Sequence, residues 1–78
     1  MGSEQVAALN KIIGMIDAKA SEYKNEYMRL PQAKRFANRK LILDLIDDAN
    51  ELGRAIKPVP AEVLEDLKRL AEQLNRLA

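Results

Sequence analysis

The sequence predicts an all-α protein, an antiparallel up-down-up three-helix bundle with a shorter third helix. Two observations support this fold class: apolar residues recur at alternating spacings of three and four along three stretches, and proline-containing segments separate the stretches. Alternating spacings of three and four place side chains on one face of an α-helix. With 78 residues, the chain has the length of one small domain. We therefore predict a single domain over residues 1–78, with helices at about 4–29, 32–56 and 61–77.

The first predicted helix carries the longest apolar stripe. Its members follow one another at steps of three or four residues: Val6, Leu9, Ile13, Ile16, Ala20, Tyr23, Tyr27 and Leu30. Ser3 is a suitable N-cap, and Glu4 lies in the first turn, where the helix dipole favours an acidic side chain. Pro31 disfavours helical backbone geometry at Leu30, so we expect the first helix to end near residue 29.

The second predicted helix is bounded by prolines. Pro31 fits the first turn of a helix, and two prolines in the segment Lys57–Pro60 hold the chain extended at the other end. The apolar stripe between these boundaries consists of Ile42, Leu45, Ala49, Leu52 and Ile56. Gly53 interrupts the stripe without ending it, because Ile56 is still in phase.

The third predicted helix is shorter than the other two. Its main stripe and a second stripe beside it consist of Val63, Leu67, Leu70, Leu74 and Leu77, and of Leu64, Ala71 and Ala78. At 1.5 Å per residue it is about 26 Å long, whereas the first two helices are about 37–39 Å long. The third helix is therefore expected to leave the tip of the helix 1–2 hairpin uncovered. From the three stripes we predict these core residues: Ile16, Leu45, Leu52, Leu67 and Leu70.

The composition changes towards the end of the chain. Residues 58–78 are dominated by Leu, Ala, Glu, Lys and Arg, with acidic side chains early in the helix and basic ones late, as the helix dipole prefers. The first two helices carry Gly, Asn, Ser, Tyr, Met and Phe at irregular positions. In these features the chain resembles designed or redesigned helical bundles, a resemblance to a class that implies no functional residues. A natural protein with a leucine-rich last helix is the alternative.

The residue types argue against catalysis. The chain has no Cys and no His, which excludes disulfides, Cys/His zinc sites and the most common general base. No glycine-rich phosphate loop is present. Four acidic residues share one face of the second helix, where we expect a solvated stripe instead of a metal site: Asp44, Asp47, Asp48 and Glu51. We expect no enzyme, no cofactor and no metal.

Charge and hydropathy argue against a membrane protein. The net charge is +1, and apolar runs such as Leu41–Leu43 are far shorter than the roughly 18–20 residues that cross a bilayer. We therefore expect a cytoplasmic protein that does not bind membranes.

The second helix places its charges against the helix dipole. Five basic residues and no acidic one occur between residues 29 and 40: Arg29, Lys34, Arg35, Arg39 and Lys40. Such a cluster is a candidate for phosphate contacts with nucleic acid. The simpler interpretation is pairing with Glu22, Glu26 or Glu72 of the neighbouring helices. Phe36 is the only aromatic residue in the cluster and no nucleic-acid-binding motif accompanies it, so the sequence argues against nucleic acid.

Phe36 and Leu43 lie one heptad apart on a face that the predicted stripe of the second helix does not use. Together with the uncovered tip, they predict a protein-binding surface of apolar side chains with a charged rim. Its residues are Tyr23, Tyr27, Met28, Leu30, Phe36, Arg39, Lys40, Leu43 and Asp47. The alternative for Tyr23, Tyr27 and Leu30 is packing against the second helix within the hairpin.

The function that the sequence favours is a non-catalytic helical interaction module or designed scaffold. The expected partner is a protein or a helical peptide, including a second copy of the chain. Two alternatives stay open: a small natural phage or bacterial protein whose basic stretch 29–40 binds nucleic acid or an acidic protein, and a design made only to fold.

Overall fold

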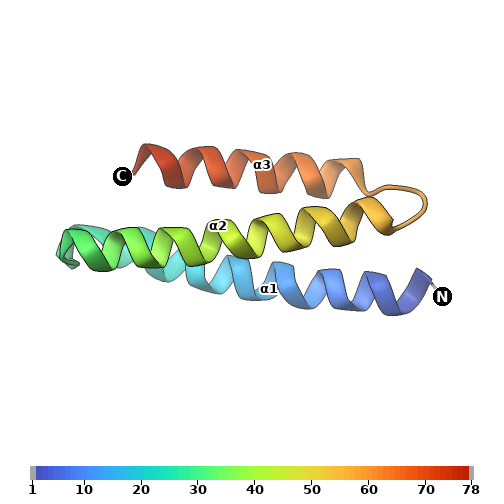
Figure 1. Ribbon diagram of the computed structural model, residues 1–78, viewed down its shortest axis with the longest axis horizontal. Helices are drawn as coiled ribbons and strands as arrows, with labels where there is room; N and C mark the ends of the chain where they lie inside the picture. The colour runs from blue at the N-terminus through green and yellow to red at the C-terminus, as the bar shows by residue number, and fades with distance from the viewer. Residues whose placement is uncertain (1, 78) are drawn as a thin grey trace.

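The computed structural model describes residues 2–77 and contains three α-helices: α1 (Gly2–Glu26), α2 (Gln32–Ala55) and α3 (Ala61–Arg76). A single 3-10 turn, η1 (Tyr27–Arg29), follows α1. The chain runs up, down and up, with α2 packed against both α1 and α3 (Figure 1). The body is elongated and measures 43 × 18 × 16 Å. The predicted three-helix bundle with a shorter third helix is confirmed, and the predicted stripe residue Ala78 lies outside the described residues.

The ends of α1 differ from the prediction. The helix begins before Ser3, so Ser3 lies inside α1 and the predicted N-cap is wrong. At the other end α1 stops at Glu26, and the last turn tightens into η1, where the Leu30 N–H donates to the Tyr27 carbonyl at 3.3 Å. Pro31 explains this end, because it forces Leu30 into an extended conformation with φ −85° and ψ 142°.

Prolines set the remaining helix ends. Pro31 immediately precedes α2, and its carbonyl accepts from the Arg35 N–H at 3.0 Å. Pro60 likewise immediately precedes α3, and its carbonyl accepts a hydrogen bond from the Leu64 N–H at 3.1 Å. Between α2 and α3 the backbone is extended at Ile56, whose side chain is buried. The predicted boundaries near Pro31 and in the segment Lys57–Pro60 are therefore confirmed.

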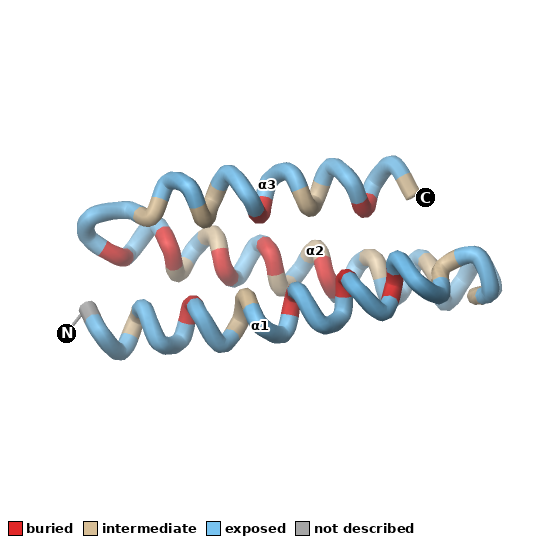
Figure 2. The backbone as a smooth tube through the Cα atoms, turned by 180° about the vertical axis from the view of Figure 1, so that it is seen from behind, coloured by how far each residue is buried: buried red, intermediate tan, exposed pale blue. Residues whose placement is uncertain are grey.

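The core lies along the inner faces of the three helices, where the buried segments in Figure 2 face one another. Ile16 of α1, Ile42 of α2 and Leu74 of α3 are the largest fully buried side chains, one from each helix. The complete cluster of buried core residues is Leu9, Ile16, Tyr23, Ile42, Ile46, Ala49, Ile56, Leu67 and Leu74. The predicted core positions Ile16 and Leu67 are confirmed.

The buried face of α2 is rotated relative to the predicted stripe. The structure buries Ile42, Ile46, Ala49, Gly53 and Ile56, whereas the predicted core residues Leu45 and Leu52 are only half-buried. The reason is that α2 has two neighbours: α3 packs on the flank that carries Ile46, and α1 packs on the other. The most buried line on α2 therefore runs between its two partners. Leu70 of α3, also predicted as core, is half-buried as well.

Gly53 of α2 is buried against the side chain of Leu64 in α3. A Cβ atom at this position would lie 2.8 Å from Leu64 Cδ2, whereas a Cβ atom at Gly14 would meet nothing within 4 Å. We expect Gly53→Leu to lower the free energy of unfolding by about 1–2 kcal/mol, because the added side chain would displace the side chain of Leu64 and this packing cost exceeds the gain in helix propensity. The matched change Gly14→Leu should raise the free energy of unfolding by up to about 1 kcal/mol, since Leu has a higher helix propensity than Gly. Urea unfolding of both variants checks this, and equal shifts would contradict the close α2–α3 contact.

Candidate protein-binding surface

The α1–α2 hairpin extends past the end of α3 (Figure 1). Gly53 and Leu64 face each other across the α2–α3 contact, and both helices rise about 1.5 Å per residue. Leu77 lies 13 residues after Leu64. Because α2 and α3 are antiparallel, Leu77 is level with about residue 40 of α2, which lies 13 residues before Gly53. The N-terminal part of α2 therefore extends past the end of α3.

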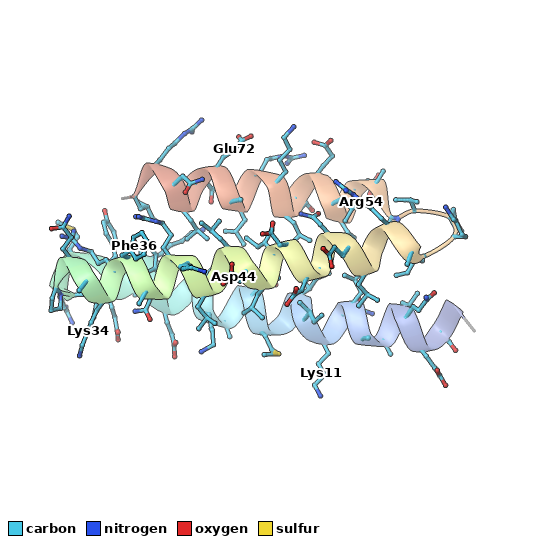
Figure 3. All side chains as sticks on the ribbon, viewed as in Figure 1. Lys11, Lys34, Phe36, Asp44, Arg54 and Glu72 are labelled. Atoms are coloured by element: carbon cyan, nitrogen blue, oxygen red, sulfur yellow. The ribbon has the colours of Figure 1, made fainter. Side chains whose placement is uncertain are left out.

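Two large apolar side chains are exposed on this uncovered tip. The exposed fraction is 81% for Met28 in η1 and 60% for Phe36 in α2. The guanidinium carbon of Arg39 lies 5.8 Å from the centroid of the Phe36 ring, a distance typical of a cation–π contact. Figure 3 shows Phe36 on the part of α2 near the hairpin tip. We call the group of Tyr27, Met28, Gln32, Arg35, Phe36 and Arg39 the tip surface.

Tyr23 does not belong to the predicted surface. Its exposed fraction is 2%, and it is part of the hydrophobic core, so the prediction that it contacts a partner is wrong. Tyr27 stacks on it with ring centroids 5.8 Å apart and is half-buried against the same core. Leu30 is also half-buried. The alternative of packing within the hairpin is confirmed for Tyr23, while Tyr27 and Leu30 keep part of their surface in solvent.

The Tyr23 hydroxyl is buried and has no hydrogen-bond partner. A buried polar group without a partner costs about 1–3 kcal/mol. We therefore expect Tyr23→Phe to raise the free energy of unfolding by about 1 kcal/mol while leaving the helix content unchanged. Tyr27→Phe, which alters a half-exposed ring, is the control and should change stability by less than about 0.5 kcal/mol. A loss of stability in Tyr23→Phe would mean that the hydroxyl is hydrogen-bonded.

Leu43 was expected to face away from the core, and this expectation is wrong. The residue is half-buried and packs against the core cluster, where it lines a hollow with Leu64 and Ala71 of α3. Phe36 and Leu43 share one flank of α2. α3 covers this flank at Leu43 and ends before it reaches Phe36.

The charged members of the predicted surface lie around its rim. Lys40 is exposed and forms an ion pair with Asp44, with Nζ and Oδ2 3.1 Å apart. Asp47 is exposed and lines the same α2–α3 hollow as Leu43. Asp44 and Asp47 therefore lie on the part of α2 that α3 accompanies, behind the tip surface. Arg39 is the one charged member of the predicted set that belongs to the tip surface itself.

Among the residues that the structure describes, most bases of the segment 29–40 have no acidic partner. Within residues 2–77, the ion pairs closer than 4.0 Å are Lys40–Asp44 and Arg69–Asp66. The expected pairing of the bases with Glu22, Glu26 or Glu72 is therefore wrong. The Lys24 side chain of α1 contacts an uncharged group: its Nζ donates a hydrogen bond to Gln73 Oε1 of α3 at 3.1 Å. The tip thus carries positive charge that the described part of the chain does not neutralise.

A hollow lined in part by Glu22, Glu26, Leu30 and Asn38 lies on the hairpin, and two others are lined by residues of the tip surface. One, of about 420 Å³, is formed where η1 and α1 meet the end of α3, and its lining residues are Lys24, Tyr27, Gln73, Arg76 and Leu77. The other, of about 170 Å³, lies on α2 and is lined by Gln32, Arg35, Phe36 and Arg39. Neither lining contains an acidic residue. The spacing of residues in the sequence does not place Lys24, Gln73, Arg76 and Leu77 at the tip, because only the register of α3 against α1 brings them there.

The described residues show no sign of a metal site or a membrane span. Residues 2–77 contain no cluster of three or more potential metal-ligating side chains, so the four acids of α2 do not converge with others. Within the same residues, no helix is long and apolar enough to span a bilayer. Comparisons of the chain with protein-family models, curated proteins and solved structures gave no match.

Proposed function

We propose that this protein is a non-catalytic helical interaction module whose tip surface binds a protein or a helical peptide. The observation that supports the proposal most strongly is the exposure of Phe36 beside Arg35 and Arg39, two arginines that form no ion pair with the residues that the structure describes. Exposed aromatic, methionine and arginine side chains are enriched in the centres of protein interfaces. The surface is formed by helices that are already folded, so little conformational entropy is lost on binding.

The outer face of α2 would serve as the rim of this interface. Lys40, Asp44 and Asp47 are exposed there, and exposed charges at an interface rim affect the rate of association more than its strength. Substitutions at these three positions are therefore expected to have smaller effects on affinity than substitutions at Phe36.

The proposal is tested by selecting displayed peptides on the full-length protein and on the variant Met28→Gln/Phe36→Gln. A matched control is Val6→Gln/Val59→Gln, which changes two exposed apolar residues at the opposite end of the bundle. We expect enriched peptides to bind the wild type and the control but not the tip variant. All three proteins should melt at similar temperatures, because the changes are on exposed side chains. Selection of peptides that bind all three proteins equally would contradict the proposal.

Binding of nucleic acid by the same bases is the second candidate function. Lys34, Arg35, Arg39 and Lys40 give the segment 32–40 four positive charges and no negative one. Phosphate contacts weaken steeply with salt, whereas apolar contacts do not. Titration with a single-stranded oligonucleotide at about 50 and 200 mM salt distinguishes the two functions: tight, salt-sensitive binding that survives Phe36→Gln would favour nucleic acid.

A designed origin remains a proposal that rests on composition. The regular Leu, Ala, Glu, Lys and Arg pattern of α3 supports it, and a design made only to fold would bind nothing through the tip. The peptide selection decides this alternative too, because such a design would give no peptide that depends on Phe36 and Met28.

A further inference from the structure

We propose that the tip surface binds an acidic amphipathic helix, which lies in line with α3 and has its N-terminal turn next to Leu77. This inference rests on the proposed function and specifies the chemistry and the direction of the partner. It is supported by the length of α3, by the charge of the two hollows, by their apolar side chains and by the helix dipole of α3.

The space beside the tip has the dimensions of a continued helix. α3 ends at Arg76, level with about residue 41 of α2, while α2 continues to Gln32. About two turns of α2 therefore offer the flank that α3 covers elsewhere. A helix placed end to end with α3 would meet Phe36 in the same way as α3 meets Leu43.

The charges that line this space are all positive. Lys24 and Arg76 line the hollow at the end of α3, and Arg35 and Arg39 line the hollow on α2. None of these four side chains is in an ion pair with the described residues. Complementary charge on the partner would be negative, and carboxylates would accept paired hydrogen bonds from the arginines.

The apolar side chains require a partner with an apolar stripe. Tyr27 and Leu77 line the first hollow, and Phe36 lines the second. These groups lie on three elements at the hairpin end of the bundle, and an amphipathic helix contacts such separate apolar groups with residues spaced by three and four. A flexible polyanion would satisfy the arginines but would leave the exposed Phe36 ring uncovered.

The dipole of α3 sets the direction of the partner. The last turn of α3 points its carbonyls towards the tip, and those of Gln73 and Leu74 accept from the Leu77 N–H. The C-terminal end of a helix carries partial negative charge, so the N-terminal end of a second helix is favoured beside it. Acidic residues beyond the first turn of that helix would lie near Arg35 and Arg39, which line the second hollow.

The experiment uses the full chain and three labelled peptides of about 16 residues with one common leucine stripe, of which about half would lie beside α2 and the rest would keep the peptide long enough to form a helix. Their polar positions carry Glu, Gln or Lys. We expect the Glu peptide to bind about ten-fold more tightly than the Gln peptide, and the Lys peptide to bind more weakly still. The variant Arg35→Glu/Arg39→Glu should remove the advantage of the Glu peptide. The control Lys11→Glu/Lys57→Glu, which changes the net charge equally at positions outside the tip surface, should keep at least half of its affinity.

A spin label on the Glu peptide tests the direction. A label at the peptide N-terminus should broaden the amide resonances of residues 74–77, and a label at its C-terminus should broaden those of residues 28–33. The reverse pattern would overturn the proposed orientation.

Three other results would overturn the inference. Equal affinity of the Glu and Gln peptides at the tip would remove the acidic partner but leave the proposed function intact. Equal affinity of a disordered polyglutamate peptide or an oligothymidylate would show that charge alone is recognised. Dimerisation in a sedimentation concentration series, lost in Phe36→Gln, would identify the occupant as a second copy. Failure of all three peptides, together with a peptide selection that finds no tip-dependent sequence, would reject the proposed function itself.

Discussion

Ile46→Ala should lower the free energy of unfolding by about 2–5 kcal/mol, the range typical of large-to-small substitutions in a core. Ile46 is 2% exposed and belongs to the central cluster. Its neighbour Leu45 is only half-buried, so Leu45→Ala should cost about half as much. Both changes remove an aliphatic side chain of the same composition from the same turn, which makes each the control of the other.

Urea unfolding monitored by circular dichroism measures the difference between these two variants. A larger loss in Leu45→Ala than in Ile46→Ala would mean that α2 is rotated towards the stripe that its sequence spacing suggests. Equal losses would also argue against the arrangement in which α3 covers the Ile46 flank.

Leu43→Gln should lower the free energy of unfolding by about 1–3 kcal/mol, because it places an amide in the partly buried contact between α2 and α3. Phe36→Gln, one heptad earlier on the same flank, should change it by less than about 0.5 kcal/mol, since the ring is 60% exposed. The pair separates a residue that stabilises the bundle from one that is available to a partner.

Thermal unfolding and sedimentation of both variants provide the measurement. If Phe36→Gln unfolded the protein, Phe36 would belong to the core and the tip surface would lose its central residue. If Leu43→Gln left stability unchanged, α3 would not cover this part of α2, and the predicted binding role of Leu43 would regain support.

The unpaired bases at the start of α2 have an energetic consequence as well. Lys34 and Arg35 stand in the first turns of the helix, where the dipole disfavours positive charge by up to about 1 kcal/mol per residue. Such a local disadvantage is common where a surface is selected for binding instead of stability. An acidic partner helix would offset it.

The sequence by itself determined the number of helices, their approximate ends and the short third helix. These features depend on local properties: the spacing of apolar residues, and the effect of Pro31, Pro58 and Pro60 on their neighbours. The length of α3 relative to the hairpin also follows from counting residues, so the uncovered tip and the exposure of Phe36 could be predicted.

Only the tertiary structure decided which flank of each helix is covered. The apolar residues of α2 cover more than one face of the helix. Such a helix can pack against one neighbouring helix or between two, and the spacing of its apolar residues is the same for both arrangements. The placement of α3 buries Ile46 and half-buries Leu43, and packing within the hairpin buries Tyr23. In the sequence, the spacing of these three residues does not distinguish them from apolar residues that are exposed. Burial results from the contacts of a helix with its neighbours, and those contacts join residues far apart in the chain.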